Sequence, residues 1–363
     1  MTPARWAFVA MLSAAGLGQG AASAETFAYV GNAASNDISV FRFAPDGGMV
    51  PVQTAAFPEV QAAGSSTPLA VSPDRRFLFA GQRAQPFQAI GFAIDPASGR
   101  LSPIGNAPLA DSMANIAFDR TGRFLFSASY GGNKVALNPV GEGGRLQPPS
   151  QVIPTGLNAH AFLPSPDNRF VFATNLGSDQ VLGFAFDASA GRLSAMPSPV
   201  LKLPEKSGPR HFVFHPNGRF IYLLDELDAA LHVIGYDAAT GGWTPLSRSS
   251  AMPVGSTDKP WAADLHLTPD GRFLYASERT TSTLSAFKVD QASGALSLIG
   301  TVPTEKQPRG FAIDPSGKFL AAVGEQSHGM TVYAIDQESG ALRPLAQYPT
   351  GRQPNWVEFV TFP

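Results

Sequence analysis

Short aromatic runs that follow a polar turn recur along the whole chain. Residues 269–277 (PDGRFLYAS) show the phrase most clearly, and residues 27–31 (FAYVG) hold the aromatic run without its turn. Other copies lie at residues 73–80, 120–128, 166–174, 216–224 and 315–323. The first aromatic residues of the seven copies are Phe27, Phe77, Phe124, Phe170, Phe220, Phe273 and Phe319. Their spacing of 46 to 53 residues predicts seven structural repeats.

Each repeat carries two further strand signals. An Asp/Gly turn, as in residues 187–193 (DASAGRL) and 290–296 (DQASGAL), separates runs in which apolar residues alternate. Such turns between alternating runs are typical of β-hairpins. A third apolar run precedes each aromatic run, as in residues 210–214 (RHFVF). Together these signals predict four antiparallel strands in every repeat.

Seven repeats of four strands predict an all-β, seven-bladed β-propeller, because the apolar faces of one blade are buried only by its neighbours. The first repeat begins at its second strand, and residues 353–362 (QPNWVEFVTF) are an extra innermost strand at the C-terminus. We therefore expect the C-terminal strand to join the first blade and close the ring. An all-β sandwich is the alternative fold.

Composition and charge exclude several classes of protein. The hydrophobic fraction of 44% excludes disorder, and 36 Gly with 32 Pro favour short strands and tight turns over long helices. A net charge of −2, without a run of Lys or Arg, argues against nucleic-acid binding. The chain has no cysteine, which excludes disulfides, thiolate metal sites and a cysteine nucleophile.

The first residues resemble an export signal. Arg5 precedes an apolar stretch at residues 6–17, and residues 22–24 (ASA) form a small-residue cleavage site. We expect residues 1–24 to be a cleaved signal peptide and residues 25–363 to be a single propeller domain. No later segment has the apolar length of a membrane span. The prediction is a periplasmic or secreted protein.

Charged side chains concentrate at two positions of the repeat, the start of the innermost strand and the end of the second strand. Both positions face one rim of the channel, where the connecting loops vary in length. One ring of positions holds Thr67, Ala114, His160, Arg210, Ala263, Arg309 and Asn355, and the other holds Ala33, Arg83, Tyr130, Leu176, Glu226, Arg279 and Glu325. Seven of these fourteen are charged or His, in a chain that is only 15% charged. This excess predicts a binding or catalytic site.

The residue types indicate chemistry on a carbonyl or a carboxylate. Arginine binds carboxylates and developing oxyanions, which suits Arg210 and Arg279, and His160 can act as a general base on water. Glu226 is a candidate partner for proton transfer. Arg309, Arg83, Glu325 and Asn355 are candidate substrate-binding residues. The structural alternative is that these charges form ion pairs, Arg210 with Glu226 or Arg279 with Glu325, that hold blades together. The remaining histidines, His211, His215, His232, His266 and His328, lie off the two rings and are expected to be structural.

No other catalytic motif competes with this site. The chain has no G-x-S-x-G, H-E-x-x-H, Walker or G-x-G-x-x-G phrase in a suitable context. Most aspartates lie in the repeated turns, so no acidic cluster for calcium is evident. We expect no metal and no cofactor.

These residues and motifs resemble the seven-bladed propeller lactonase family, which contains the propeller-type 6-phosphogluconolactonase and the carboxymuconate cyclase. The resemblance covers residues 25–363, and its most specific parts are residues 159–160 (AH), 208–211 (GPRH), 225–227 (DEL) and 269–279 (PDGRFLYASER). It implies active-site roles for the matching His160, Arg210, Glu226 and Arg279. It also implies a small lactone or carboxylate as substrate, and metal-independent hydrolysis of a sugar lactone or a related lactone.

Two other functions remain open from the sequence. One is a non-catalytic exported propeller that binds a ligand or a protein partner. The other is a cyclase that runs the reverse reaction, closing a lactone from an unsaturated diacid. A phosphorylated sugar lactone is a cytoplasmic metabolite, so export favours an unphosphorylated lactone as the substrate.

Overall fold

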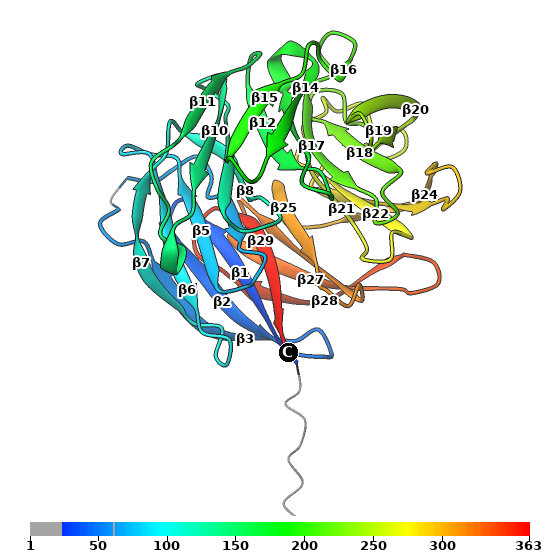
Figure 1. Cartoon of the computed structure of the whole chain (residues 1–363). Coiled ribbons are helices and arrows are strands. Elements are labelled where there is room, and N and C mark those ends of the chain that lie inside the picture. The colour runs from blue at the N-terminus through cyan, green and yellow to red at the C-terminus, as the bar shows by residue number, and fades with distance from the viewer. Residues whose placement is uncertain (1–23, 61) are drawn as a thin grey trace, which may run out of the picture.

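Seven antiparallel sheets form a closed ring in the computed structural model, which describes residues 24–60 and 62–363. The innermost strands are β29 (Pro354–Phe362), β4 (Leu69–Val71), β8 (Met113–Phe118), β12 (Ala159–Pro164), β17 (Pro209–Phe214), β21 (Ala262–Leu267) and β25 (Pro308–Ile313). The second strands are β1 (Glu25–Asn32), β5 (Phe77–Gln82), β9 (Phe124–Ser129), β13 (Phe170–Asn175), β18 (Phe220–Asp225), β22 (Phe273–Glu278) and β26 (Phe319–Gly324). Figure 1 shows the innermost strands gathered around the middle of the molecule.

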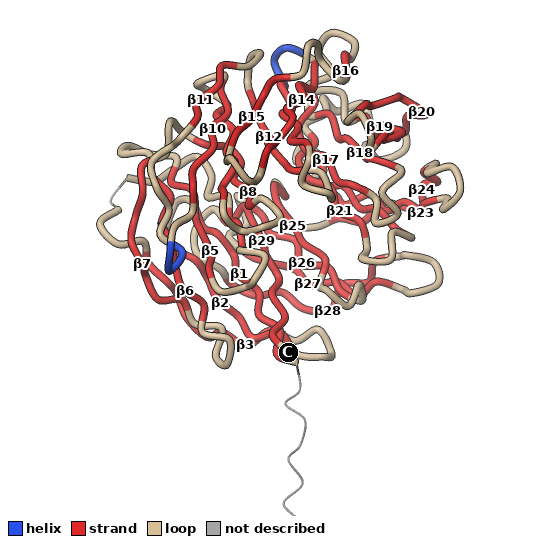
Figure 2. Tube along the Cα trace, viewed as in Figure 1, coloured by secondary structure: helices blue, strands red, loops and turns tan. Residues whose placement is uncertain are grey.

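The outer half of each blade is made by two further strands. The third strands are β2 (Asp37–Phe43), β6 (Gln88–Ile94), β10 (Lys134–Pro139), β14 (Gln180–Asp187), β19 (Ala230–Asp237), β23 (Thr283–Val289) and β27 (Gly329–Ile335). The outermost strands are β3 (Met49–Ala56), β7 (Leu101–Pro108), β11 (Gln151–Pro154), β15 (Arg192–Ala195), β20 (Gly242–Ser250), β24 (Leu296–Pro303) and β28 (Leu342–Pro349). A short fifth strand, β16 (Leu201–Lys202), also pairs with β14. The helical turns in the described residues are η1 (Glu142–Gly144) and η2 (Leu176–Ser178) (Figure 2).

The C-terminal strand closes the ring. β29 pairs antiparallel with β1, with Ala28 opposite Phe359, so the first blade has the strand order β29-β1-β2-β3. Figure 1 shows this C-terminal strand beside the N-terminal one. The seven-bladed propeller and its closure are confirmed, and the sandwich alternative is wrong. In six of the seven repeats, the first aromatic residue after the turn is also the first residue of its strand.

The core consists of apolar layers between neighbouring blades. Phe27 and Tyr29 of β1 pack with Leu78 of β5 and Ile90 of β6, and equivalent layers follow around the ring. Each layer takes one face from each of two sheets, so no blade has a complete core of its own. The ring therefore holds its innermost strands rigidly around the channel.

A repeated tyrosine links neighbouring blades at one rim. The hydroxyls of Tyr29, Tyr222 and Tyr275 donate to the carbonyls of Gly99, Gly294 and Gly340 in the Asp/Gly turns of the next blades, at 2.9, 2.9 and 2.8 Å. The same strand position is Phe79, Phe126 or Phe172 in three other blades. An aromatic ring is thus needed for packing there, and the hydroxyl adds a specific hydrogen bond.

Replacing Tyr222 by Phe is expected to lower the free energy of unfolding by about 1 kcal/mol, because the buried carbonyl of Gly294 loses its donor. The ring itself is retained, so packing is preserved. Urea denaturation of the variant and the wild type measures the difference. An unchanged midpoint would show that the hydroxyl does not contribute to the blade contact.

The predicted signal peptide lies outside the described residues, except for Ala24. Within the part of the chain that is described, no helix has the length and apolar character needed to cross a membrane.

Candidate active site

Irregular pairing near the start of the innermost strands brings the functional side chains together. The register shifts between Pro209 and His211 in β17, and between Ala262 and Leu265 in β21, with similar shifts in β8, β12 and β25. A bulge disrupts the alternation of a strand, so two consecutive side chains can face the same side. Arg210 and His211 lie at such a bulge: the Arg210 guanidinium reaches Glu226, and the His211 ring lines a cavity of the channel.

The centre of the site is a carboxylate between two arginines. Oε2 of Glu226 accepts a hydrogen bond from Nε of Arg210 at 2.9 Å and forms an ion pair with Nη2 of Arg279 at 2.8 Å. The Arg210 side chain is only 1% exposed, and its Nη1 also donates to the carbonyl of Ala263. Burial and the Arg279 charge lower the pKa of Arg210 to about 9, which leaves it ionised at pH 7. The site thus holds fixed positive charge in a dry environment.

Glu226 is ionised in this arrangement. Burial raises its pKa, but the charges of Arg210 and Arg279 outweigh burial and hold the pKa of Glu226 below its usual range. A permanently ionised carboxylate is a poor proton donor at neutral pH. The geometry therefore favours Glu226 as the residue that positions both guanidinium groups.

Trp261 holds Arg279 in place, and Glu278 orders the loops next to it. Its guanidinium lies 3.9 Å from the centroid of the Trp261 ring, and its Nε donates to the Trp261 carbonyl at 3.1 Å. Glu278 is fully buried and accepts hydrogen bonds from the backbone amides of Trp261 and Thr281 at 2.6 and 2.7 Å. Glu278 therefore orders the loop segments on both sides of Arg279.

His160 lies beside this charged group in β12. It is 4% exposed, and its ring packs against Tyr130 and His211, with centroids 6.0 and 5.0 Å away. Burial, followed by the charges of Arg210, His211, Arg309 and Arg83, lowers the pKa of His160 well below its ordinary value. His160 is therefore neutral at pH 7 and has a lone pair for accepting a proton.

The candidate substrate-binding residues occupy different environments. Nη1 of Arg309 lies 3.4 Å from Oε1 of Glu325, and Arg83 donates to the hydroxyls of Ser66 and Ser112 at 2.9 and 3.2 Å. Arg309 and Arg83 both act electrostatically on His160, so they belong to the same cluster. Asn355 is buried and accepts from the Thr67 amide at 2.8 Å, which links β29 to the next blade.

The cluster has an excess of positive charge. Its four arginines, Arg83, Arg210, Arg279 and Arg309, outnumber the two carboxylates that pair with them, Glu226 and Glu325. Such a site attracts anions and stabilises the negative charge that develops on a carbonyl oxygen. Of the two ion pairs that the structural alternative expects, Arg210 with Glu226 is present, whereas Arg279 also pairs with Glu226 and Glu325 pairs with Arg309. These pairs are part of the same site.

The sequence of residues 27–359 matches the family described as "Lactonase, 7-bladed beta-propeller". The chain belongs to this family. A 6-phosphogluconolactonase of Pectobacterium carotovorum is 40% identical over 286 residues, or 79% of this chain and 84% of that relative. The structure of a periplasmic gluconolactonase from Pseudomonas aeruginosa is 31% identical with a TM-score of 0.85, and the match covers 94% of this chain and 100% of that one. The protein is therefore a lactone-hydrolysing enzyme.

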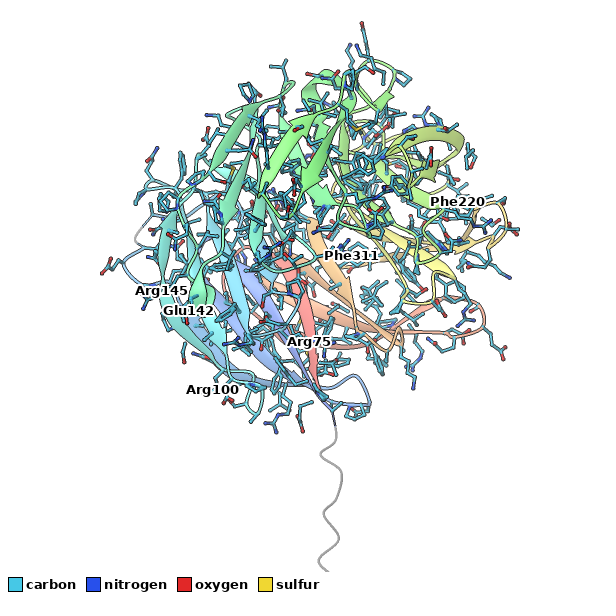
Figure 3. All side chains as sticks on the ribbon, viewed as in Figure 1. Arg75, Arg100, Glu142, Arg145, Phe220 and Phe311 are labelled. Carbon is cyan, nitrogen blue, oxygen red and sulfur yellow. The ribbon has the colours of Figure 1, made fainter. Side chains whose placement is uncertain are left out.

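Sequence reasoning missed part of the channel. His211 and His266 were expected to be structural, but both line a channel cavity of about 160 Å³, together with Asp264, Trp356 and Glu358. Strand alternation alone places His211 away from the channel, and the bulge reverses that orientation. Phe311 of β25 lines the same cavity, and Figure 3 shows it near the middle of the ring.

Proposed function

We propose that the enzyme hydrolyses an unphosphorylated sugar lactone, of the gluconolactone type, with His160 as the general base. The observation that carries this proposal is a buried, neutral histidine beside a cluster of net positive charge. In this mechanism His160 removes a proton from water as the water oxygen attacks the lactone carbonyl carbon. The resulting tetrahedral oxyanion lies against the guanidinium groups of Arg210 and Arg279.

The second half of the reaction returns the proton. The bond between the carbonyl carbon and the ring oxygen breaks, and protonated His160 donates its proton to the departing ring oxygen. The products are the hydroxyl and the carboxyl group of one open-chain hydroxy acid. Glu226 takes no part in proton transfer in this scheme, because its ion pairs keep it ionised. Its role is to hold both arginines at the oxyanion position.

Arg309 and Arg83 are proposed to bind the hydroxyl-rich body of the substrate and then the carboxylate of the product. Glu325 restrains Arg309 and leaves part of its guanidinium available, since the Arg309 side chain is 16% exposed. Asn355 is proposed to support this wall of the site through its bond to Thr67. A product that leaves as an anion is attracted by these charges, so product release is expected to be faster at higher salt.

The choice of an unphosphorylated substrate rests on location. The pattern at residues 1–24 is that of an export signal, and the Pseudomonas aeruginosa structure is a periplasmic gluconolactonase. We place the mature enzyme in the periplasm on these two grounds. Membership of a lactonase family argues against a non-catalytic binding propeller, and no contact in the described site favours the cyclase direction over hydrolysis.

A panel of lactones tests the substrate assignment. The full chain is expressed with its own leader, purified and assayed by acid release against gluconolactone, 6-phosphogluconolactone and an aliphatic lactone, with the spontaneous rate subtracted. We expect the highest kcat/KM for gluconolactone. Higher kcat/KM for the phosphorylated lactone would contradict the substrate assignment, and no enzymatic turnover of any lactone would contradict the mechanism.

A further inference from the structure

A histidine–aspartate pair, His211 and Asp264, lies beside His160. Nδ1 of His211 in β17 lies 2.8 Å from Oδ1 of Asp264 in β21, the innermost strand of the next blade. The Asp264 side chain is 13% exposed, and its other carboxylate oxygen lies 3.2 Å from Nε2 of His266. The mechanism above uses none of these three side chains. They lie on the two innermost strands that follow β12 around the ring.

The electrostatics assign the proton on His211. Burial raises the pKa of Asp264, but His266 and the hydrogen bond from His211 outweigh burial and hold that pKa far below its usual range. Burial, followed by the Arg210 charge, lowers the pKa of His211 to about 4, although Asp264 opposes this shift. His211 is therefore neutral, and it carries its single proton on Nδ1, where the ionised carboxylate accepts it. Its Nε2 is left with a lone pair.

Two ring nitrogens in this region are buried without a partner among the described residues, Nε2 of His211 and Nδ1 of His160. The two rings are neighbours, with centroids 5.0 Å apart and planes inclined by 64°. The two nitrogens are not hydrogen-bonded to one another in the structure. At this centroid separation, a rotation of the two rings can bring one nitrogen of each to about 2.9 Å from the other. Nε2 of His211 is a buried acceptor without a donor. A proton on Nδ1 of His160 satisfies this acceptor and gives Nδ1 a partner as well.

We propose that Asp264 and His211 are positioning residues that set the tautomer of His160, through the chain Asp264–His211–His160. His211 donates from Nδ1 to Asp264 and accepts at Nε2 the proton on Nδ1 of His160. His160 then has its lone pair on Nε2, which leaves that nitrogen to accept the proton of the attacking water. This inference rests on the proposed role of His160 as the base. It adds two residues to the machinery, neither of which touches the substrate.

The bulged strands explain how this chain of residues arises. Thr174 accepts from the amide of Ala161 at 3.0 Å and donates to the carbonyl of Arg210 at 2.7 Å, which ties β12 to β17 beside the two histidines. Asp264 is held in turn by its backbone amide, which donates to Ser277 at 3.1 Å. The three side chains therefore come from three adjacent blades, and the first two of these blades are linked by hydrogen bonds beside the histidines.

The tautomers can be read without any assay of activity. Long-range ¹H–¹⁵N correlation spectra of the histidine rings distinguish a protonated ring nitrogen from an unprotonated one, and His160→Gln and His211→Gln assign the signals. At pH 7.5 we expect Nδ1 to carry the proton in both His160 and His211. A proton on Nε2 of His160 would overturn the proposal, whether or not the enzyme proves to be a lactonase.

Kinetics distinguish positioning from packing. His211→Gln keeps one donor for Asp264 and one acceptor for His160, so its kcat is expected to stay within about tenfold of the wild type. His211→Phe fills the same space without either bond, and its kcat is expected to fall by at least about 10²-fold with little change in KM.

His266→Gln is the matched control, because it lies in the same cavity without a link to His160 and glutamine can still donate a hydrogen bond to Asp264. Its kcat is expected to stay near that of the wild type. Equal losses in His266→Gln and His211→Phe would assign the cluster a structural role and overturn the proposal. If His160→Gln itself retained full activity, the proposed function would fail, while the tautomer spectra would still decide the present inference.

Discussion

Replacing His160 by Gln is expected to lower kcat by about 10²- to 10⁴-fold and to leave the folded structure intact. Glutamine has a similar size and can occupy the pocket beside Tyr130 and His211, but it cannot accept and return a proton. Because His160 is neutral and forms no ion pair with a described residue, its replacement leaves no buried charge without a partner. Steady-state assays on the best lactone of the panel, together with thermal unfolding, measure both effects.

His232→Gln is the control for this experiment. His232 is 8% exposed and lies 2.7 Å from Asp225, but it belongs to the third strand of its blade, away from the channel. We expect His232→Gln to lower stability and to leave kcat unchanged, which is the reverse of His160→Gln. A His160→Gln variant that keeps most of the wild-type kcat would contradict the role of His160 as the base.

Replacing Arg210 by Met is expected to damage both activity and stability. Loss of one donor to the oxyanion lowers kcat by about 10²- to 10³-fold. The same change leaves the carboxylate of Glu226 buried with Arg279 alone, and breaking a buried ion pair in this way costs about 3 kcal/mol. Steady-state kinetics and urea denaturation are the two measurements.

The double variant Arg210→Met with Glu226→Gln separates the two effects. It removes the unpaired charge along with its partner, so we expect most of the stability to return while activity stays low. If Arg210→Met unfolds at the same urea concentration as the wild type, the ion pair does not stabilise the ring. If the double variant regains activity, Arg210 does not act on the oxyanion.

Most of the fold could be predicted because its signals are local and repeated. The first aromatic residue marks the start of a strand in six of the seven repeats, as with Phe220 in β18 and Phe273 in β22. The extra strand at the C-terminus, now β29, pairs with β1 as the missing strand of the first repeat required. Counting strands per repeat was therefore sufficient to predict both the number of blades and the closure of the ring.

The site was predicted in part, because its positions recur at the same place in each repeat. Counting residues from the first aromatic residue of each repeat placed Arg210, Glu226 and Arg279 at one rim. In the structure Glu226 contacts both arginines there. Counting failed for His211, because a bulge inserts an extra residue and turns the next side chain toward the channel. Nothing in the spacing of the repeats marks a bulge of this kind.

The amino-acid sequence by itself determined the sevenfold repeat, the four strands of each blade and the positions where charge collects, since these depend on neighbours within one repeat. Only the tertiary structure decided which charged side chains pair with one another and which titratable groups are protonated at neutral pH. His160 is neutral because of burial and of the Arg210 charge in the next blade. Glu226 is ionised because Arg210 and Arg279, the second of them in another blade, outweigh burial. Those contacts join residues from different repeats, and closing the ring is what brings them within a few ångströms of one another.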